Sequence, residues 1–273
     1  DVCSSDLPPY FNLVFAPLMV PLLFVLVPGT VAHWREDRWH DMWLRLRGVG
    51  LASLALAVVV PLVLGAWSFG TALGVFLGMW VALGSLQHVV ERLRKPGRVG
   101  GSFWGMHLAH LGLAVVVLGI TGVKSYEVER DVRMGLGDTV TISPFTFKLV
   151  DMVDVNGPNY KAMQAHVEVS KNGQVFEVLY PEKRRYFSSA MPMTEAAIDS
   201  GPLRDLYVSL GDPIAGETPS WSMRVYYKPF VPWLWTGVLL MVMGGLLAAL
   251  DRRYRRPSAA PMQTASEALS SAS

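Results

Sequence analysis

Two histidines inside an apolar run are the residues of this sequence best suited to chemistry. His107 and His110 lie in FWGMHLAHLGLAVVVLGITG, residues 103–122, and a run of this length can cross a bilayer. An ionisable side chain at membrane depth is costly and marks a functional site by default, and imidazole is a common ligand for haem iron. A membrane histidine can equally hydrogen-bond a neighbouring helix. The run alone therefore leaves a ligand role and a packing role equally open.

The spacing of the two histidines limits any haem site. Three residues along a helix separate the side chains by about 60° and about 4.5 Å, so this pair cannot clasp a haem from opposite faces. A six-coordinate haem takes one ligand here and a second from another helix. The remaining histidines lie in loops, in a strand or at the inner end of a span, where surface or headgroup contacts are expected: His33, His40, His88 and His166. The second ligand is expected from His88, from another residue type, or from sequence not present in this chain.

The composition predicts a polytopic membrane protein that positions these histidines. Of 273 residues, 51% are hydrophobic and 17% are charged, which is too apolar for an ordinary soluble domain. The net charge of +2 gives no reason to expect a nucleic-acid partner. Five apolar stretches have the length of a membrane helix, and they cover residues 11–32, 48–66, 71–90, 103–122 and 232–250.

The distribution of basic residues predicts the orientation of these helices. Arginine and lysine gather in segments 33–47 and 91–101 and in the tail that begins at residue 251. Basic segments favour the cytoplasmic side, so these three are expected inside, and the N-terminus and residues 123–231 outside. We therefore expect four spans within residues 8–122 and a fifth at 232–250, in contact with the lipid bilayer.

Residues 123–231 predict one external, β-rich domain resembling a sandwich or barrel. Alternating runs flank Asn172-Gly173, a dipeptide that signals a two-residue hairpin turn. TEAAIDSG, residues 194–201, is expected to be a short helical turn or a loop. The tail at 251–273 is expected to be cytoplasmic and disordered, and residues 1–7, which contain the lone Cys3, to be an artefact or a disordered start.

No other catalytic pattern is present in the sequence. There is no phosphate-binding glycine loop, no HExxH and no GxSxG, and Asp151 and Asp154 are expected to be solvated. Five external cations could pair with carboxylates of a ligand, haem propionates included, although solvated strand positions are favoured; they are Arg184, Arg185, Arg204, Arg224 and Lys228.

Several stretches together resemble the C-terminal portion of the CcmF family, the haem lyase subunit of bacterial cytochrome c maturation. They are PPYFNLVFAPLMVPL (8–22), GMHLAHLG (105–112), YEVERDVRM (126–134), GPNYKA (157–162), EKRRYF (182–187), MTEAAID (193–199), RDLYVSLG (204–211) and VYYKPFVPWLW (225–235). The resemblance extends from about residue 8 to about residue 256. A NrfE-like paralogue, which matures cytochrome c nitrite reductase, would look much the same.

The resemblance implies a haem b site and a set of partners. The family helps to join haem to apocytochrome c outside the bacterial cytoplasmic (inner) membrane, and holds a b-type haem through two transmembrane histidines. One belongs to an AHLG motif, here residues 109–112, which selects His110 as an axial ligand of the haem iron and leaves His107 a weak candidate. Implied partners are apocytochrome c, a holo-haem chaperone and a thiol-handling subunit.

The family's other functional segments lie upstream and match nothing in this chain. They are the second transmembrane histidine, a tryptophan-rich segment and external histidines. The chain is thus expected to be a fragment with half of the haem site, unable to perform the full reaction alone. The alternative from another class is a non-catalytic membrane scaffold that presents a β domain to assembly partners.

Overall fold

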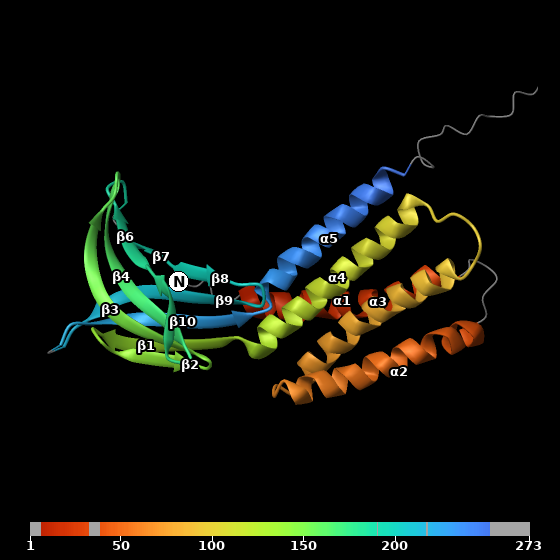
Figure 1. Cartoon of the computed structure of the whole chain (residues 1–273), viewed down its shortest axis with the longest axis horizontal. Helices are drawn as coiled ribbons and strands as arrows, with labels where there is room; N and C mark the ends of the chain where they lie inside the picture. Colours follow the sequence, from red (N-terminus) through yellow and green to blue (C-terminus); the bar gives the residue numbers. More distant parts are fainter. Residues whose placement is uncertain (1–6, 33–38, 190, 217, 252–273) are drawn as a thin grey trace, which may run out of the picture.

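The chain forms a bundle of long helices joined to a β-sandwich. The computed structural model describes residues 7–32, 39–189, 191–216 and 218–251 (Figure 1). The predictions for residues 1–6, His33 and the tail from residue 252 therefore lie outside the described residues. Figure 1 shows the sandwich at one end of the molecule and the helices extending side by side from it.

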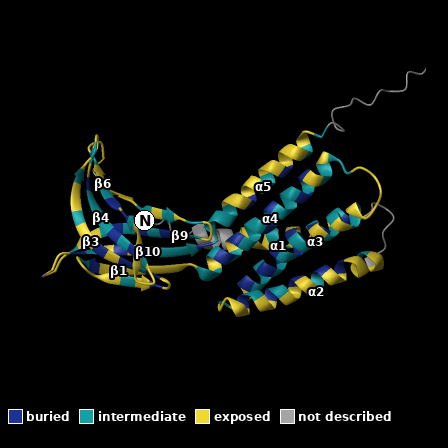
Figure 2. Cartoon of the chain, viewed as in Figure 1, coloured by how far each residue is buried: buried dark blue, intermediate teal, exposed yellow. Residues whose placement is uncertain are grey.

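Within the described ranges, five helices are long and apolar enough to span a membrane. Four precede the sandwich: α1 (Leu7–Val31), α2 (Trp39–Val63), α3 (Phe69–Leu93) and α4 (Gly101–Tyr126). The fifth, α5 (Val231–Ala249), follows it. Helices of this length and composition are typical of a multi-pass membrane protein. Figure 2 shows many exposed positions along the helices, which suits helices in contact with lipid.

Several helices extend beyond the apolar stretches that predicted them, and α2 does so most. α2 begins at Trp39, whereas the apolar stretch begins at residue 48, because the polar segment before it continues the same helix. α3 ends at Leu93, three residues past the predicted span. Hydropathy detects the apolar part of a helix and misses its polar ends.

The sandwich consists of two antiparallel sheets. One has the strand order β1 (Val128–Gly135), β10 (Ser220–Pro229), β9 (Arg204–Ile214) and β8 (Ala197–Ser200). The other has the order β2 (Thr139–Ile142), β3 (Phe145–Asn156), β4 (Tyr160–Lys171), β6 (Glu182–Tyr186) and β7 (Met193–Glu195), with β5 (Gln174–Leu179) also paired to β4. The predicted fold class, membrane helices with a β-sandwich, is confirmed. The segment expected as a helical turn or loop forms β7 and β8 instead.

Alternating residues of both sheets fill the sandwich core. Phe147 and Leu149 of β3 and Val208 and Leu210 of β9 are fully buried, as the period of two in a strand requires. The predicted hairpin is present: Lys171 pairs with Gln174 across Asn172-Gly173, and both turn residues have positive φ, 52° and 80°. Positive φ at both central residues defines the type I′ turn.

The sandwich is joined to the membrane helices at two neighbouring points. α4 passes into β1 through the single residue Glu127, and β10 passes into α5 through the single residue Phe230. β1 and β10 pair with each other, with Val128 opposite Tyr227. The Phe230 and Tyr126 rings lie 6.5 Å apart at this junction.

Candidate functional site

Three histidines and a phenylalanine form a cluster between α3 and α4. The His107 ring lies at the centre, with ring centroids 4.9 Å from His88 and 4.4 Å from Phe103. The His110 ring lies 6.3 Å from His107. His107 and His110 come from successive turns of α4, and His88 comes from the facing turn of α3. The structure thus joins the two predicted histidines to a third.

The imidazole nitrogens at the centre of the cluster lack hydrogen-bond partners. His107 is only 2% exposed, and both of its ring nitrogens are buried without a partner. His110 is half-buried, and its Nδ1 is likewise buried without a partner. Buried polar atoms are nearly always hydrogen-bonded, and leaving one unpaired costs about 1–3 kcal/mol. Unpaired imidazole nitrogens at membrane depth suit a bound group that requires nitrogen ligands.

Small residues on α3 allow α4 to approach closely and place the cluster. A Cβ at Gly74 would lie 2.1 Å from Thr121 Oγ1, and one at Gly78 would lie 2.7 Å from Leu118. The Thr71 and Ser125 hydroxyls hydrogen-bond at 2.8 Å near the sandwich end of the same pair. These contacts fix the register of α3 against α4.

The opposite side of α4 packs against α5 through a second set of glycines. A Cβ at Gly112 would lie 2.6 Å from the Gly237 carbonyl oxygen, and one at Gly244 would lie 2.5 Å from the Ala109 backbone nitrogen. Such backbone contact is typical of membrane helices that pack through small residues. α4 is therefore held between α3 and α5, and its histidines cannot turn toward α5 without a large rearrangement.

His88 is the residue whose place sequence reasoning missed. We expected it to contact headgroups at the inner end of its span, but its ring packs edge-to-face on Phe103 and His107. The continuation of α3 to Leu93 places His88 more than a turn inside the helix. The signal was the run of helix-forming residues after His88, which lengthens the helix beyond its apolar part.

The other described histidines stay apart from this cluster. His40 is exposed at the start of α2, 3.7 Å from Asp41. His166 lies in the middle of β4 rather than at its start, and it is half-buried. Its Nε2 is 3.1 Å from the Gln164 side-chain oxygen. Neither contributes to a membrane site.

Most of the external cations pair with carboxylates of this chain. Arg184 lies 2.7 Å from Glu182 and 3.3 Å from Glu195, and the hydrogen bond to Glu182 raises the pKa of its guanidinium. Arg204 pairs with Asp199. The expectation of simple solvated positions is wrong for these two residues, because the chain itself supplies their partners.

Arg224 and Lys228 have partners on the sheet that contains β1. Arg224 pairs with Asp131, which raises the pKa of the guanidinium. Lys228 lies 4.6 Å from the Tyr226 ring centre. Asp151 and Asp154 are exposed on β3, as expected. Among the described residues no group of three or more histidine, cysteine, aspartate and glutamate side chains could hold a metal ion.

Comparison with known proteins gives consistent matches along the chain. Residues 125–229 match the family model described as the CcmF C-terminal beta-sandwich. The chain is 40% identical over 267 residues to the cytochrome c-type biogenesis protein CcmF of Escherichia coli K12, covering 96% of this chain and 40% of the relative. It is 41% identical over 254 residues to CcmF of Pseudomonas aeruginosa, covering 91% of this chain and 38% of the relative.

CcmF and its paralogue NrfE can be compared within one organism, Haemophilus influenzae. Haemophilus influenzae CcmF is 39% identical to this chain over 258 residues, with 90% of this chain and 39% of the relative covered. NrfE of the same organism is 29% identical over 257 residues, with 91% and 39% covered. The sequence is thus closer to CcmF than to NrfE.

A solved structure shows the same fold. "Cytochrome c Heme Lyase CcmF" superposes with a TM-score of 0.71 at 21% identity, covering 89% of this chain and 40% of that chain. The chain spans about 40% of the length of the relatives that it matches. The family model, the relatives and the shared fold agree, and the chain is similar to the CcmF cytochrome c-type biogenesis proteins.

Proposed function

We propose that this chain is part of a haem lyase subunit that holds a b-type haem in the cytoplasmic membrane, with His110 as one axial ligand. The observation that carries the proposal is the half-buried imidazole of His110 within a helical bundle, whose Nδ1 is buried without a hydrogen-bond partner while Nε2 is not among the buried atoms. The donor chemistry fits, because neutral imidazole is a common axial ligand of haem iron. The proposal agrees with the names of the relatives in cytochrome c biogenesis.

The difference in burial favours His110 over His107 as the ligand. His107 is enclosed by the rings of His88 and Phe103 and is 2% exposed. A haem is far larger than a side chain and needs an open approach to its ligand. His110 is half-buried and offers that approach. His107 packs beside His110 and helps to hold it in place.

The residues around His110 would provide a dry and rigid site. Packing of α4 between α3 and α5 fixes the helix that carries His110. Burial excludes water and strengthens electrostatic interactions. A haem bound there would supply one-electron chemistry, which the side chains of this sequence cannot provide. The second axial ligand would come from outside this chain.

The sandwich would face the periplasm, where haem is joined to apocytochrome c, and the loop between α3 and α4 would face the cytoplasm. That loop and the end of α3 carry Arg92, Arg94, Lys95 and Arg98, and basic loops favour the cytoplasmic side. Apocytochrome c, a haem chaperone and a thiol-handling subunit are the proposed partners of the assembled protein.

A chimera tests the role of His110. This chain replaces the aligned 40% of the E. coli relative in a strain that lacks its own copy of that protein. His110→Ala is expected to lower both b-haem content and cytochrome c yield by about tenfold or more, because loss of a ligand should cost at least as much as loss of an outer partner. His40→Ala, at an exposed position on α2, is the matched control and is expected to change neither.

The same experiment separates the enzyme from a scaffold. Normal haem content and cytochrome c yield in the His110→Ala chimera would overturn the ligand role and favour a scaffold that acts through its sandwich. If removal of residues 139–230 then abolished maturation while His110→Ala had no effect, the scaffold alternative would hold.

A further inference from the structure

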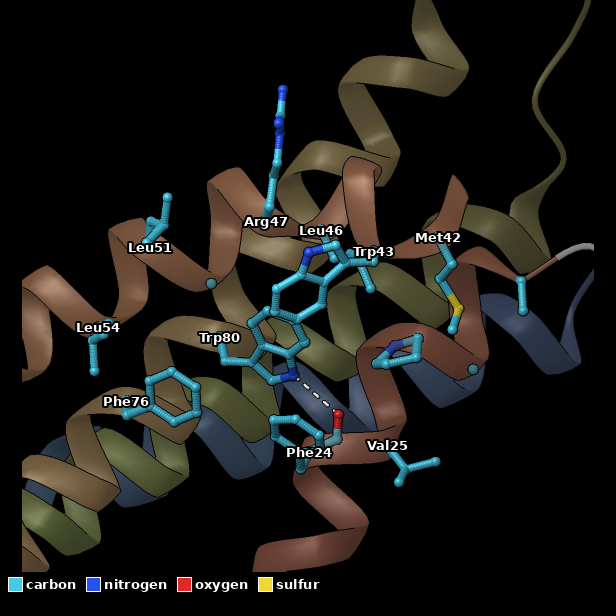
Figure 3. A pocket seen from close by; sticks show the side chains of 14 residues that line it. Phe24, Val25, Met42, Trp43, Leu46, Arg47, Leu51, Leu54, Phe76 and Trp80 are labelled. Carbon is cyan, nitrogen blue, oxygen red and sulfur yellow. Dashed lines mark hydrogen bonds between the residues drawn. The ribbon is translucent and has the colours of Figure 1, made fainter. Parts of the chain in front are cut away.

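A deep apolar groove on the far side of α3 takes no part in the histidine cluster. α1, α2 and α3 enclose a space of about 950 Å³. Figure 3 shows the Trp80 and Trp43 rings over this space, with Phe24 and Phe76 beside them. The Phe24 and Phe76 rings stack on Trp80 at 5.7 Å and 6.1 Å. The Trp80 indole donates to the Phe24 carbonyl oxygen at 3.0 Å, so the aromatic floor has its polar atom satisfied.

The groove fits within one bilayer leaflet. Its lining runs from Met42 to Leu54 on α2 and from Phe24 on α1 to Ala32, just past the end of that helix. At about 1.5 Å per residue, the stretch from Arg47 to Leu54 is about 10 Å long and that from Phe24 to Ala32 is about 12 Å long, less than half of a hydrocarbon core of about 30 Å. α1 runs opposite to α2, so Ala32 and Met42 lie at the same end. In the proposed orientation that end is cytoplasmic.

The cytoplasmic mouth of the groove carries an aromatic residue and a cation. Trp43 is 71% exposed, as an interfacial tryptophan would be. Arg47 borders the groove, and Figure 3 shows its side chain directed away from the aromatic floor. Asp41 lies nearer the helix start, beside His40 at 3.7 Å. A ligand with an apolar tail inside and a negative group at the rim would match this arrangement.

We propose that this groove binds an anionic phospholipid of the cytoplasmic leaflet, with one acyl chain along the Trp80 floor and the phosphate at Arg47. The inference rests on the proposed orientation and not on the haem role of His110. Its length matches a chain confined to one leaflet, and its rim has the charge that favours an anionic headgroup by about 1 kcal/mol per cation.

Glycines in the lining allow a direct test. A Cβ at Gly29 meets nothing within 4 Å, so Gly29→Leu places a side chain in the groove without a clash. Gly48 on α2 and Gly245 on α5 also meet nothing within 4 Å and lie outside the lining. Gly48→Leu and Gly245→Leu are therefore matched controls for the added side chain.

The probe is phosphatidylglycerol with brominated acyl chains, added to the whole chain purified in detergent, with phosphatidylcholine of the same chains as comparison. Bound lipids are counted by native mass spectrometry, and bromine quenching of tryptophan fluorescence reports the position. The wild type is expected to retain one phosphatidylglycerol. Gly29→Leu is expected to bind it about tenfold more weakly, equivalent to displacing about two methylenes. The two controls are expected to bind as the wild type does.

Two further variants locate the headgroup and the chain. Arg47→Gln is expected to lose a preference of about fivefold for phosphatidylglycerol over phosphatidylcholine. At one lipid per protein, Trp43→Phe is expected to lower the quenching, and the quenching that remains should come from Trp80 on the floor of the groove. Trp104→Phe is expected to leave quenching unchanged, because exposed Trp104 on α4 is outside the groove.

Three results would overturn the proposal. Equal lipid binding by the wild type and Gly29→Leu would show that the lipid does not bind in the groove, and that a protein segment or detergent occupies it instead. Equal affinity of the wild type for phosphatidylglycerol and phosphatidylcholine would show that the groove does not select an anionic headgroup. Equal loss of quenching in the Trp43 and Trp104 variants would indicate bulk lipid contact. If Gly29→Leu fails to fold, the quenching comparison of the two tryptophan variants decides.

Discussion

His107 and His110 differ in how much of each imidazole the protein covers, and this difference is the reason for proposing different roles for them. The fully enclosed His107 has two nitrogens without hydrogen-bond partners. These unpaired nitrogens destabilise the fold, whereas the packing of the ring stabilises it. Replacing an unpaired buried polar group by an apolar group of similar shape is nearly neutral or stabilising. The ring of His107 therefore matters more than its nitrogens in this chain.

The variant His107→Phe tests that conclusion. We expect the free energy of unfolding to stay equal or to rise by up to about 1 kcal/mol, measured by thermal melting of the detergent-solubilised chain. His40→Phe, at an exposed position, should leave it unchanged. A loss above about 1 kcal/mol would mean that the nitrogens of His107 have partners after all. Loss of b-haem from the matching chimera would make His107 the ligand.

Asp205 on β9 gives the sandwich a pH dependence. Burial raises the pKa of its carboxyl, against attraction from Arg204 and Lys228, and its Oδ1 has no hydrogen-bond partner. A raised pKa means that the folded chain binds more protons than the unfolded chain between the ordinary value, about 3.9, and the raised one. The free energy of unfolding therefore falls as the pH rises through this window.

Asp205→Asn should remove this penalty. The amide keeps an acceptor for the hydrogen bond that Ser200 makes to the carboxyl but carries no charge to desolvate. We expect a gain of about 1 kcal/mol at neutral pH that disappears below about pH 4, measured by urea unfolding followed by circular dichroism. Asp154→Asn, exposed on β3, is the control. A gain that persists unchanged in acid would contradict the explanation.

At the scale of elements, the seam between α4 and α5 holds the helix of the histidines in place. Gly244 faces α4, and a Cβ there would lie 2.5 Å from the backbone at Ala109. Its neighbour Gly245 faces open space, with nothing within 4 Å. Two adjacent glycines of the same helix therefore have opposite tolerance for a side chain.

Gly244→Leu should force the two helices apart, while Gly245→Leu should not. Overpacking of this kind costs about 3 kcal/mol, so the melting temperature of the first variant should fall clearly and that of the second should match the wild type. Thermal melting in detergent measures both. Equal melting temperatures in the two variants would show that the seam contributes little to stability.

The elements were largely predictable, and the site was predictable in part. Apolar length located the helices, because a membrane helix needs about 20 such residues, and Asn172-Gly173 located its hairpin. The polar start of α2 carries no hydropathy signal. The strands β7 and β8 were missed because they are only three and four residues long, too short to show an alternating apolar pattern. His88 entered the cluster only through the packing of α3 on α4, which depends on glycines that no local pattern identifies.

At the scale of the whole molecule, the basic loops predict which end faces the cytoplasm. In a chain with Cys3 replaced by Ser, a cysteine at Gln174, exposed in the sandwich, should react with a membrane-impermeant maleimide in intact spheroplasts. A cysteine at exposed Arg98 should react only after the membrane is opened. The opposite pattern would reverse the proposed orientation.

The two one-residue junctions are expected to make the sandwich and α4, the helix of His110, move together. α4 continues into β1, and the paired strand β10 continues into α5. The two strands are joined by backbone hydrogen bonds, and the two helices are joined by glycine contacts. Each junction is one residue long, which leaves little chain to absorb a rotation. A partner that tilts the sandwich is therefore expected to tilt α4 with it, so that a binding event at the sandwich would reach the membrane helices directly.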